Sequence, residues 1–152
     1  MSDALPLTHS WPLFEQHQRL DLGCLLDEPS DALVAPGRPG LLEARGIGLW
    51  ECNLEDNALS WTPGVFDLFG LPRGVTIQRD EITALYAEPS RAAMERLRAH
   101  AIKHRRGFTL DAEILPVNGP PRWMRLIAAP VCVGRQVVRL HGIKQDVSAI
   151  YR

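Results

Sequence analysis

The chain has 152 residues, 45% of them hydrophobic, which is enough for one globular domain with an appendage and for a core that needs no disulfides. Seventeen basic and eighteen acidic residues give a net charge of -1, which excludes a strong overall attraction to nucleic acid or to an anionic membrane. No apolar run reaches the roughly 18 to 20 residues of a membrane-spanning helix and no secretory leader is recognisable, so we expect a cytoplasmic protein.

The first 45 residues combine apolar side chains with a linker rich in proline and glycine. A helix is predicted at about residues 12–26 and a short one at 41–45, with the linker between them. The apolar set is Trp11, Leu13, Phe14, Leu20, Leu22, Leu25 and Leu26. Because such a surface favours aggregation when exposed, we expect it to cover the sheet of this chain, that of a second copy, or both.

A first hairpin is predicted at residues 47–54 and 58–62, joined by the turn-forming residues 55–57. Three helices are predicted to follow, at about residues 63–70, 80–88 and 90–106. The longest carries Met94, Leu97 and Ala101 on one face.

Residues 108–148 predict three antiparallel strands in a row. Apolar and polar residues alternate from Phe108 to Ile114, which is the period of a strand with one buried face. Residues 123–133 are apolar on both faces, so we expect a central strand that is covered on both sides. A two-residue turn at Gly134 leads into residues 136–146. Strands, helices and strands in this order indicate an α+β fold with a five-stranded antiparallel sheet and its helices on one face.

Short motifs in a fixed order resemble the PAS domain family, whose C-terminal half is often called PAC. They are Gly46-Ile47-Gly48-Leu49-Trp50-Glu51, Leu59-Ser60-Trp61-Thr62, Phe66-Asp67-Leu68-Phe69-Gly70-Leu71, Gly119, Arg122-Trp123, Ala129-Pro130-Val131, Gly134, the segment from Val137 to Gly142, and Asp146-Val147-Ser148. Glu113 departs from the pattern, since many relatives carry arginine there. The resemblance implies a PAS-like fold over residues 46–148, a helical extension and linker at 1–45, and the stub of an output helix at 149–152.

This resemblance also implies a sensory or regulatory module of bacterial signalling proteins, such as two-component systems, that acts through protein-protein interaction. In many relatives the element that begins at Asp146 leads to an effector, so the expected partner is a signalling protein or an effector domain. We also predict a homodimer built on residues 10–45 and the outer sheet face. The residues assigned to interface and signal are Trp11, Phe14, Leu22, Leu41, Ile127 and Asp146.

The volume between helices and sheet is predicted to be either a filled core or a ligand pocket, and the large apolar side chains favour the filled core. Its expected walls are Phe66, Phe69, Leu85, Met94, Leu97, Phe108, Leu110 and Leu140. The alternative to a sensory module is a small α+β enzyme or a ligand-carrier domain with a pocket of its own. We expect no enzyme, because the sequence has no nucleophile elbow, phosphate loop or dinucleotide motif.

No cofactor or metal is predicted. His100 and His104 lie four residues apart on one helix, but no third ligand is evident, and a basic helix end explains both. Residues 63–107 lack the cysteine of flavin-binding relatives, and three scattered cysteines without CxxC spacing indicate reduced thiols. The basic run at residues 103–106 has no interleaved aromatic residues, so no nucleic-acid partner is expected.

Overall fold

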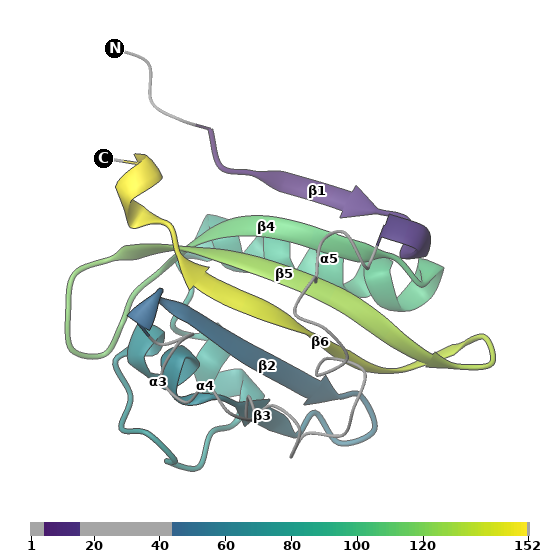
Figure 1. Cartoon of the computed structure of the whole chain (residues 1–152), viewed down its shortest axis with the longest axis horizontal. Coiled ribbons are helices and arrows are strands. Elements are labelled where there is room, and N and C mark those ends of the chain that lie inside the picture. The colour runs from purple at the N-terminus through teal and green to yellow at the C-terminus, as the bar shows by residue number, and fades with distance from the viewer. Residues whose placement is uncertain (1–4, 16–43, 152) are drawn as a thin grey trace.

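An antiparallel sheet with helices on one face forms the frame of the chain (Figure 1). The computed structural model describes residues 5–15 and 44–151. In these ranges the strands are β1 (Thr8–Trp11), β2 (Ile47–Asn53), β3 (Leu59–Trp61), β4 (Gly107–Ile114), β5 (Arg122–Val133) and β6 (Gln136–Asp146). Their order across the sheet is β1-β4-β5-β6-β2-β3, and every neighbouring pair is antiparallel.

The predicted meander of β4, β5 and β6 is confirmed. Gly134 has a φ of 61°, a left-handed conformation that glycine adopts without a steric penalty, and it turns β5 into β6. The first hairpin is also confirmed, as β2 and β3. β2 lies beside β6, so the first hairpin joins the sheet next to the last strand of the chain.

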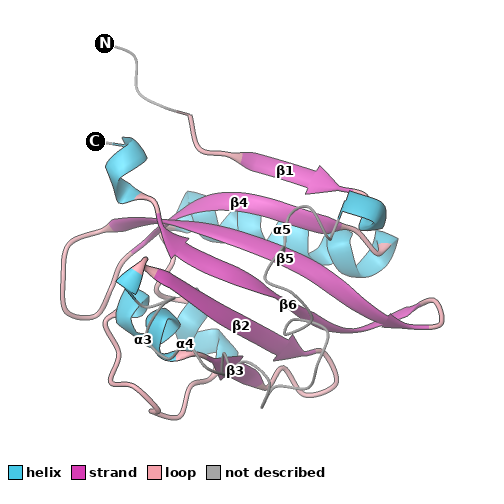
Figure 2. Ribbon diagram, viewed as in Figure 1, coloured by secondary structure: helices cyan, strands magenta, loops and turns pink. Residues whose placement is uncertain are grey.

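Helices α3 (Pro63–Phe69), α4 (Arg79–Thr83) and α5 (Glu88–His104) lie on the same side of the sheet (Figure 2). Proline begins α3 in its first turn, and Gly70 ends it with a φ of 70°. The helix approaches β2 closely because Gly48 has no side chain. A Cβ at Gly48 would lie only 2.4 Å from Cγ2 of Val65.

The two faces of the sheet bury different clusters. The helix side holds the large core, which includes Trp50, Phe69, Met94, Phe108 and Leu140. On the outer face a smaller cluster joins Trp11, Leu49 and Ala129, with Ile127 and Ile143 beside it. Alternate residues of β5 therefore serve two cores, which explains why this strand is apolar on both faces.

The structure corrects the predicted five-stranded sheet, because the described residues form six strands. The additional strand, β1, ends at Trp11, just before the predicted start of the N-terminal helix, in a segment for which no strand was predicted. β4 would otherwise have an unpaired edge, and Thr8–Trp11 supply the missing backbone partners. The chain then makes a short 3-10 turn, η1 (Leu13–Glu15), and the rest of the helix predicted at residues 12–26 lies outside the described residues. The short helix predicted at 41–45 also falls mostly outside them.

The predicted boundary at Pro89 is a second correction. We expected Pro89 to end one helix, but α5 begins at Glu88 and holds Pro89 in its first turn, where the missing backbone N–H costs nothing. A last 3-10 turn, η4 (Ser148–Tyr151), follows β6. None of the helices in the described ranges is long and apolar enough to cross a membrane.

Candidate functional site

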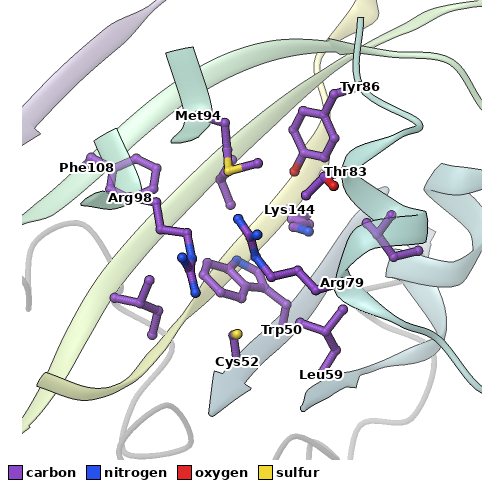
Figure 3. Close-up of a pocket in the computed structure, with 13 residues that line it drawn as sticks. Trp50, Cys52, Leu59, Arg79, Thr83, Tyr86, Met94, Arg98, Phe108 and Lys144 are labelled. Carbon is purple, nitrogen blue, oxygen red and sulfur yellow. The ribbon is translucent and has the colours of Figure 1, made fainter. Parts of the chain in front are cut away.

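A cavity of about 60 Å³ lies between α4, α5 and the helix-facing side of the sheet (Figure 3). Its walls are mostly apolar, with a few basic and hydroxyl side chains. The lining residues are Trp50, Cys52, Leu59, Arg79, Ile82, Thr83, Tyr86, Met94, Arg98, Phe108, Leu126, Leu140 and Lys144. The core is therefore not completely filled, contrary to the prediction that we favoured.

Lys144 is the unusual member of this wall. It continues the inward-facing positions of β6 after Leu140 and Gly142, and only 6% of it is exposed. Its Nζ lies 5.4 Å from the ring centroids of Trp50 and Trp61 and 5.1 Å from that of Phe69. These distances are within the range of cation–π attraction, so three ring faces replace part of the lost hydration.

Burial disfavours the charged ammonium and lowers the pKa of Lys144 to about 7. The nearby Arg79 acts in the same direction, whereas Cys52 opposes the shift. Within the described part of the chain, no carboxylate forms an ion pair with Lys144. The side chain can therefore gain or lose a proton near neutral pH.

Two arginines reach the cavity from the helices (Figure 3). Arg98 of α5 donates to Oδ1 of Asn57 at 3.1 Å, and Arg79 of α4 forms an ion pair with Glu95. Burial raises the pKa of the Cys52 thiol, and Arg98 partly opposes this rise. None of the lining residues in the described ranges is acidic, so the cavity concentrates positive charge against aromatic and aliphatic walls.

The outer face of the sheet carries a second set of polar contacts. Asp111 of β4 accepts two bonds from Arg125 of β5, with Nε to Oδ1 at 2.8 Å and an Nη to Oδ2 at 2.9 Å. The hydroxyl of Tyr151 in η4 donates to the same carboxylate. On the opposite side, the backbone N–H of Asp111 donates to the carbonyl of Leu7 at 2.6 Å. Asp111 thus joins the N-terminal strand segment to the C-terminal turn.

Aromatic rings flank this junction. Trp123 stacks on Tyr151 with 4.5 Å between ring centroids, and it is only half-buried, although the strand that begins there was expected to be covered on both sides. Trp11 is completely buried, and its indole N–H donates to Oγ1 of Thr109 at 3.3 Å. The Trp11 ring fits because its cross-strand partner is Gly107, where a Cβ would lie 2.3 Å from the ring.

Of the predicted wall residues, Met94, Phe108 and Leu140 line the cavity. The others lie in the surrounding core or against it, which leaves them outside the cavity wall: Phe66, Phe69, Leu85, Leu97 and Leu110.

Sequence reasoning missed the basic residues. Lys144 shares the inward parity of Leu140, and Arg98 lies four residues after Met94 on the same helix face, so both positions were readable as inward-facing.

The predicted interface residues are separated in space. Trp11 and Ile127 meet in the outer-face cluster, whereas Asp146 is exposed at the end of β6, where its Oδ1 accepts from the N–H of Ser148 at 2.9 Å. Phe14 follows β1 in η1. Leu22 and Leu41 lie outside the described residues.

Metal ligands do not converge in the described part of the chain, where no group of three His, Cys, Asp or Glu could hold an ion. His100 and His104 are exposed and lie against each other with 4.5 Å between ring centroids. Desolvation lowers the pKa of His104, and the neighbouring basic side chains of His100, Lys103 and Arg106 act in the same direction.

Comparison with known proteins shows the fold. No family model matches the sequence, and no curated protein does. Among solved structures, the N-terminal domain of a diguanylate cyclase with PAS/PAC sensor from Marinobacter aquaeolei is 18% identical, with a TM-score of 0.64; the match covers 70% of this chain and 99% of that one. A sensory box histidine kinase/response regulator from Burkholderia thailandensis is 20% identical, with a TM-score of 0.58, over 71% and 82% of the two chains.

An RNA-binding light-oxygen-voltage receptor is 14% identical, with a TM-score of 0.61; the match covers 70% of this chain but only 30% of the receptor. The chain therefore corresponds to less than a third of that longer protein. The described residues have the α+β fold of PAS/PAC sensor domains, as the sequence motifs predicted.

Proposed function

We propose that this chain, which has the fold of PAS sensor domains, is the sensory module of a signalling protein and that its signal is a small molecule bound in the core. One observation carries the proposal: the helix side of the sheet holds a cavity of about 60 Å³ with apolar walls and a few polar side chains. Concave, mostly apolar sites with a few polar groups are the usual form of small-molecule sites. The apolar walls and the few polar side chains of this cavity are suited to holding a small molecule. We therefore propose a sensor rather than an enzyme.

We propose that the outer sheet face transmits the signal from the cavity to the C-terminal turn η4. Lys144 and Asp146 are in the same strand, β6, which leads directly into η4, and η4 is tied to Asp111 by Tyr151. A ligand that moves β6 would change the position of η4. We propose residues 46–148 as the sensing domain, 1–45 as an extension that contributes β1, and 149–152 as the start of an output element toward an effector domain or a signalling partner, in a two-component or related system.

A homodimer is part of the proposal. Its expected contact uses residues 10–45 and the outer sheet face, where Ile127 and Ile143 are only partly buried. Trp11 is already buried on its own sheet, so its contribution is to shape this face. Light scattering should give twice the monomer mass for the full chain, and deletion of residues 1–40 should give a monomer or an aggregate. A full chain that stays monomeric at high micromolar concentration contradicts the dimer.

The ligand proposal is tested with the purified full chain. Native mass spectrometry should find a retained small molecule, or a metabolite screen should find one that raises the melting temperature. Leu59→Trp, which places a large ring at the cavity wall, should abolish that binding, whereas the exposed Leu115→Trp should leave it unchanged. If no molecule binds and Leu59→Trp behaves as the wild type does in the whole screen, the proposed function is wrong.

A further inference from the structure

The positive charges at the cavity exceed the negative charges that face them. Arg79 has Glu95 as its ion partner, but Arg98 bonds to the neutral side chains of Asn57 and Cys52, and Lys144 faces aromatic rings. Lys144 is a buried cation without a carboxylate partner in the described residues, which is costly, and the partly exposed Arg98 adds a second positive charge at the same cavity, so an occupant that supplies negative charge is favoured.

The size of the cavity limits that occupant. An apolar cavity of about 150 Å³ holds benzene, whereas roughly 10 to 15 Å³ of probe-occupied volume is enough for one water. A volume of about 60 Å³ therefore holds a group smaller than benzene between the cavity walls. Leu59, Phe108 and Leu140 offer apolar contacts. A short aliphatic carboxylate matches this wall better than phosphate or sulfate, which have no apolar part.

We propose that the cavity binds a carboxylate of about two to four carbons, with Arg98 and Lys144 as the carboxylate-binding residues and Phe108 and Leu140 against the alkyl part. The inference rests on the proposed function, because it names the chemical class of the same ligand. Arginine offers paired N–H donors to a carboxylate, and lysine adds a point charge. The basic, aromatic and aliphatic lining residues then act together at one small site.

Binding should depend on pH through Lys144. The groups that face it are Cys52 from β2, Arg79 from α4 and Arg98 from α5, with Tyr86 between the helices; Glu95 is held by Arg79. Burial raises the pKa values of Cys52 and Tyr86, so both stay neutral near pH 7. Small carboxylates ionise near pH 4 to 5, like Asp and Glu, so above roughly pH 6 Lys144 is the group that changes charge.

The test compares propionate with propionamide, which has nearly the same shape but no charge. Isothermal titration calorimetry of the full chain should show binding of propionate and at least about tenfold weaker binding of propionamide. Propionate should bind at least about tenfold more tightly at about pH 6 than at about pH 9, because the ammonium form is lost between them.

Two variants separate the role of Lys144 in propionate binding from that of Arg98, and a third is the control. Lys144→Met should weaken propionate binding about tenfold at about pH 6 and remove the pH dependence. Arg98→Met should weaken binding by a similar factor but keep the pH dependence. Arg91→Met, an exposed arginine on the same helix that does not line the cavity, should bind as the wild type does.

Equal affinity for propionate and propionamide, or unchanged propionate affinity in Lys144→Met, overturns the inference. If neither probe binds while native mass spectrometry recovers a neutral molecule, the carboxylate inference is wrong and the proposed function stands. A third outcome is that neither probe binds, that no molecule is recovered and that Leu59→Trp has no effect in the screen. In that case both the carboxylate inference and the proposed function are wrong.

Discussion

At the scale of single residues, the most informative side chain is a lysine in the core. Lysine is almost never fully buried without a partner, yet Lys144 is 6% exposed and lies beside three aromatic rings. Replacing Lys144 by an apolar residue would remove the cost of desolvating its charge. A buried charge that destabilises the fold indicates a role in binding.

The free energy of unfolding should report this cost. The pKa of Lys144 falls from its ordinary value near 10.4 in the unfolded chain to about 7 in the fold, so between these values the unfolded state binds more protons and stability rises with pH. Lys144→Met should be more stable than the wild type by about 1 to 4 kcal/mol near pH 7. Urea unfolding at about pH 7 and about pH 9 should show this difference shrinking at the higher pH. Lys103→Met, which removes an exposed lysine, is the control. If Lys144→Met keeps the wild-type pH slope, the lysine is not desolvated.

Asp111 is the residue on which the outer-face contacts depend. Asp111→Asn should cost about 1 to 3 kcal/mol, because the partly exposed Arg125 loses its carboxylate partner and Tyr151 loses a charged acceptor. Chemical unfolding measures the loss, and a double-mutant cycle with Tyr151→Phe gives the share of the Tyr151 contact. Asp67→Asn, whose ion pair with Arg73 is exposed, should change stability by less than about 1 kcal/mol. Equal effects of the two substitutions would show that the Asp111 contacts contribute little.

At the scale of elements, β1 shows where local sequence patterns stop being informative. Pro12 and the following leucines are typical of a helix start, whereas four residues from Thr8 to Trp11 are too few to show a strand period. They become a strand because β4 offers an unpaired edge and Gly107 leaves room for the Trp11 ring. The unpaired edge of β4 and the space at Gly107 both depend on the assembled sheet, so neither can be predicted from the local sequence.

Trp11 should be the residue that holds β1 in place. Trp11→Ala should cost on the order of 3 kcal/mol and accelerate hydrogen exchange at the amide of Asp111, which bonds to the carbonyl of Leu7. Gly107→Val should have a similar effect on exchange, because its side chain would occupy the place of the ring. Leu5→Ala, at a residue that is 87% exposed, should change nothing. Unchanged exchange in Trp11→Ala would mean that backbone pairing alone retains the strand.

At the scale of the whole molecule, the sequence predicted the central features of the fold. The alternation of β4 and the turn at Gly134 are local signals, and the ordered motifs identified the PAS-like arrangement that the solved structures share. The candidate site was predicted only in part. Met94, Phe108 and Leu140 were found as apolar wall residues, but Arg79, Arg98 and Lys144 were missed because charged side chains are normally assigned to solvent. Whether a core leaves a cavity depends on packing between elements, which no local pattern encodes.

The central claim is that a small molecule in the cavity changes the C-terminal end of the fold. A two-dimensional amide NMR spectrum of the full chain, titrated with propionate, tests it most directly. The account predicts saturable shifts in β6 around Lys144 and in α5 around Arg98, together with shifts at Tyr151 in η4, which does not line the cavity. Leu59→Trp should lose all of them. If propionate and the molecules found by the screen leave β6 and η4 unshifted while binding elsewhere, the cavity is not the sensing site.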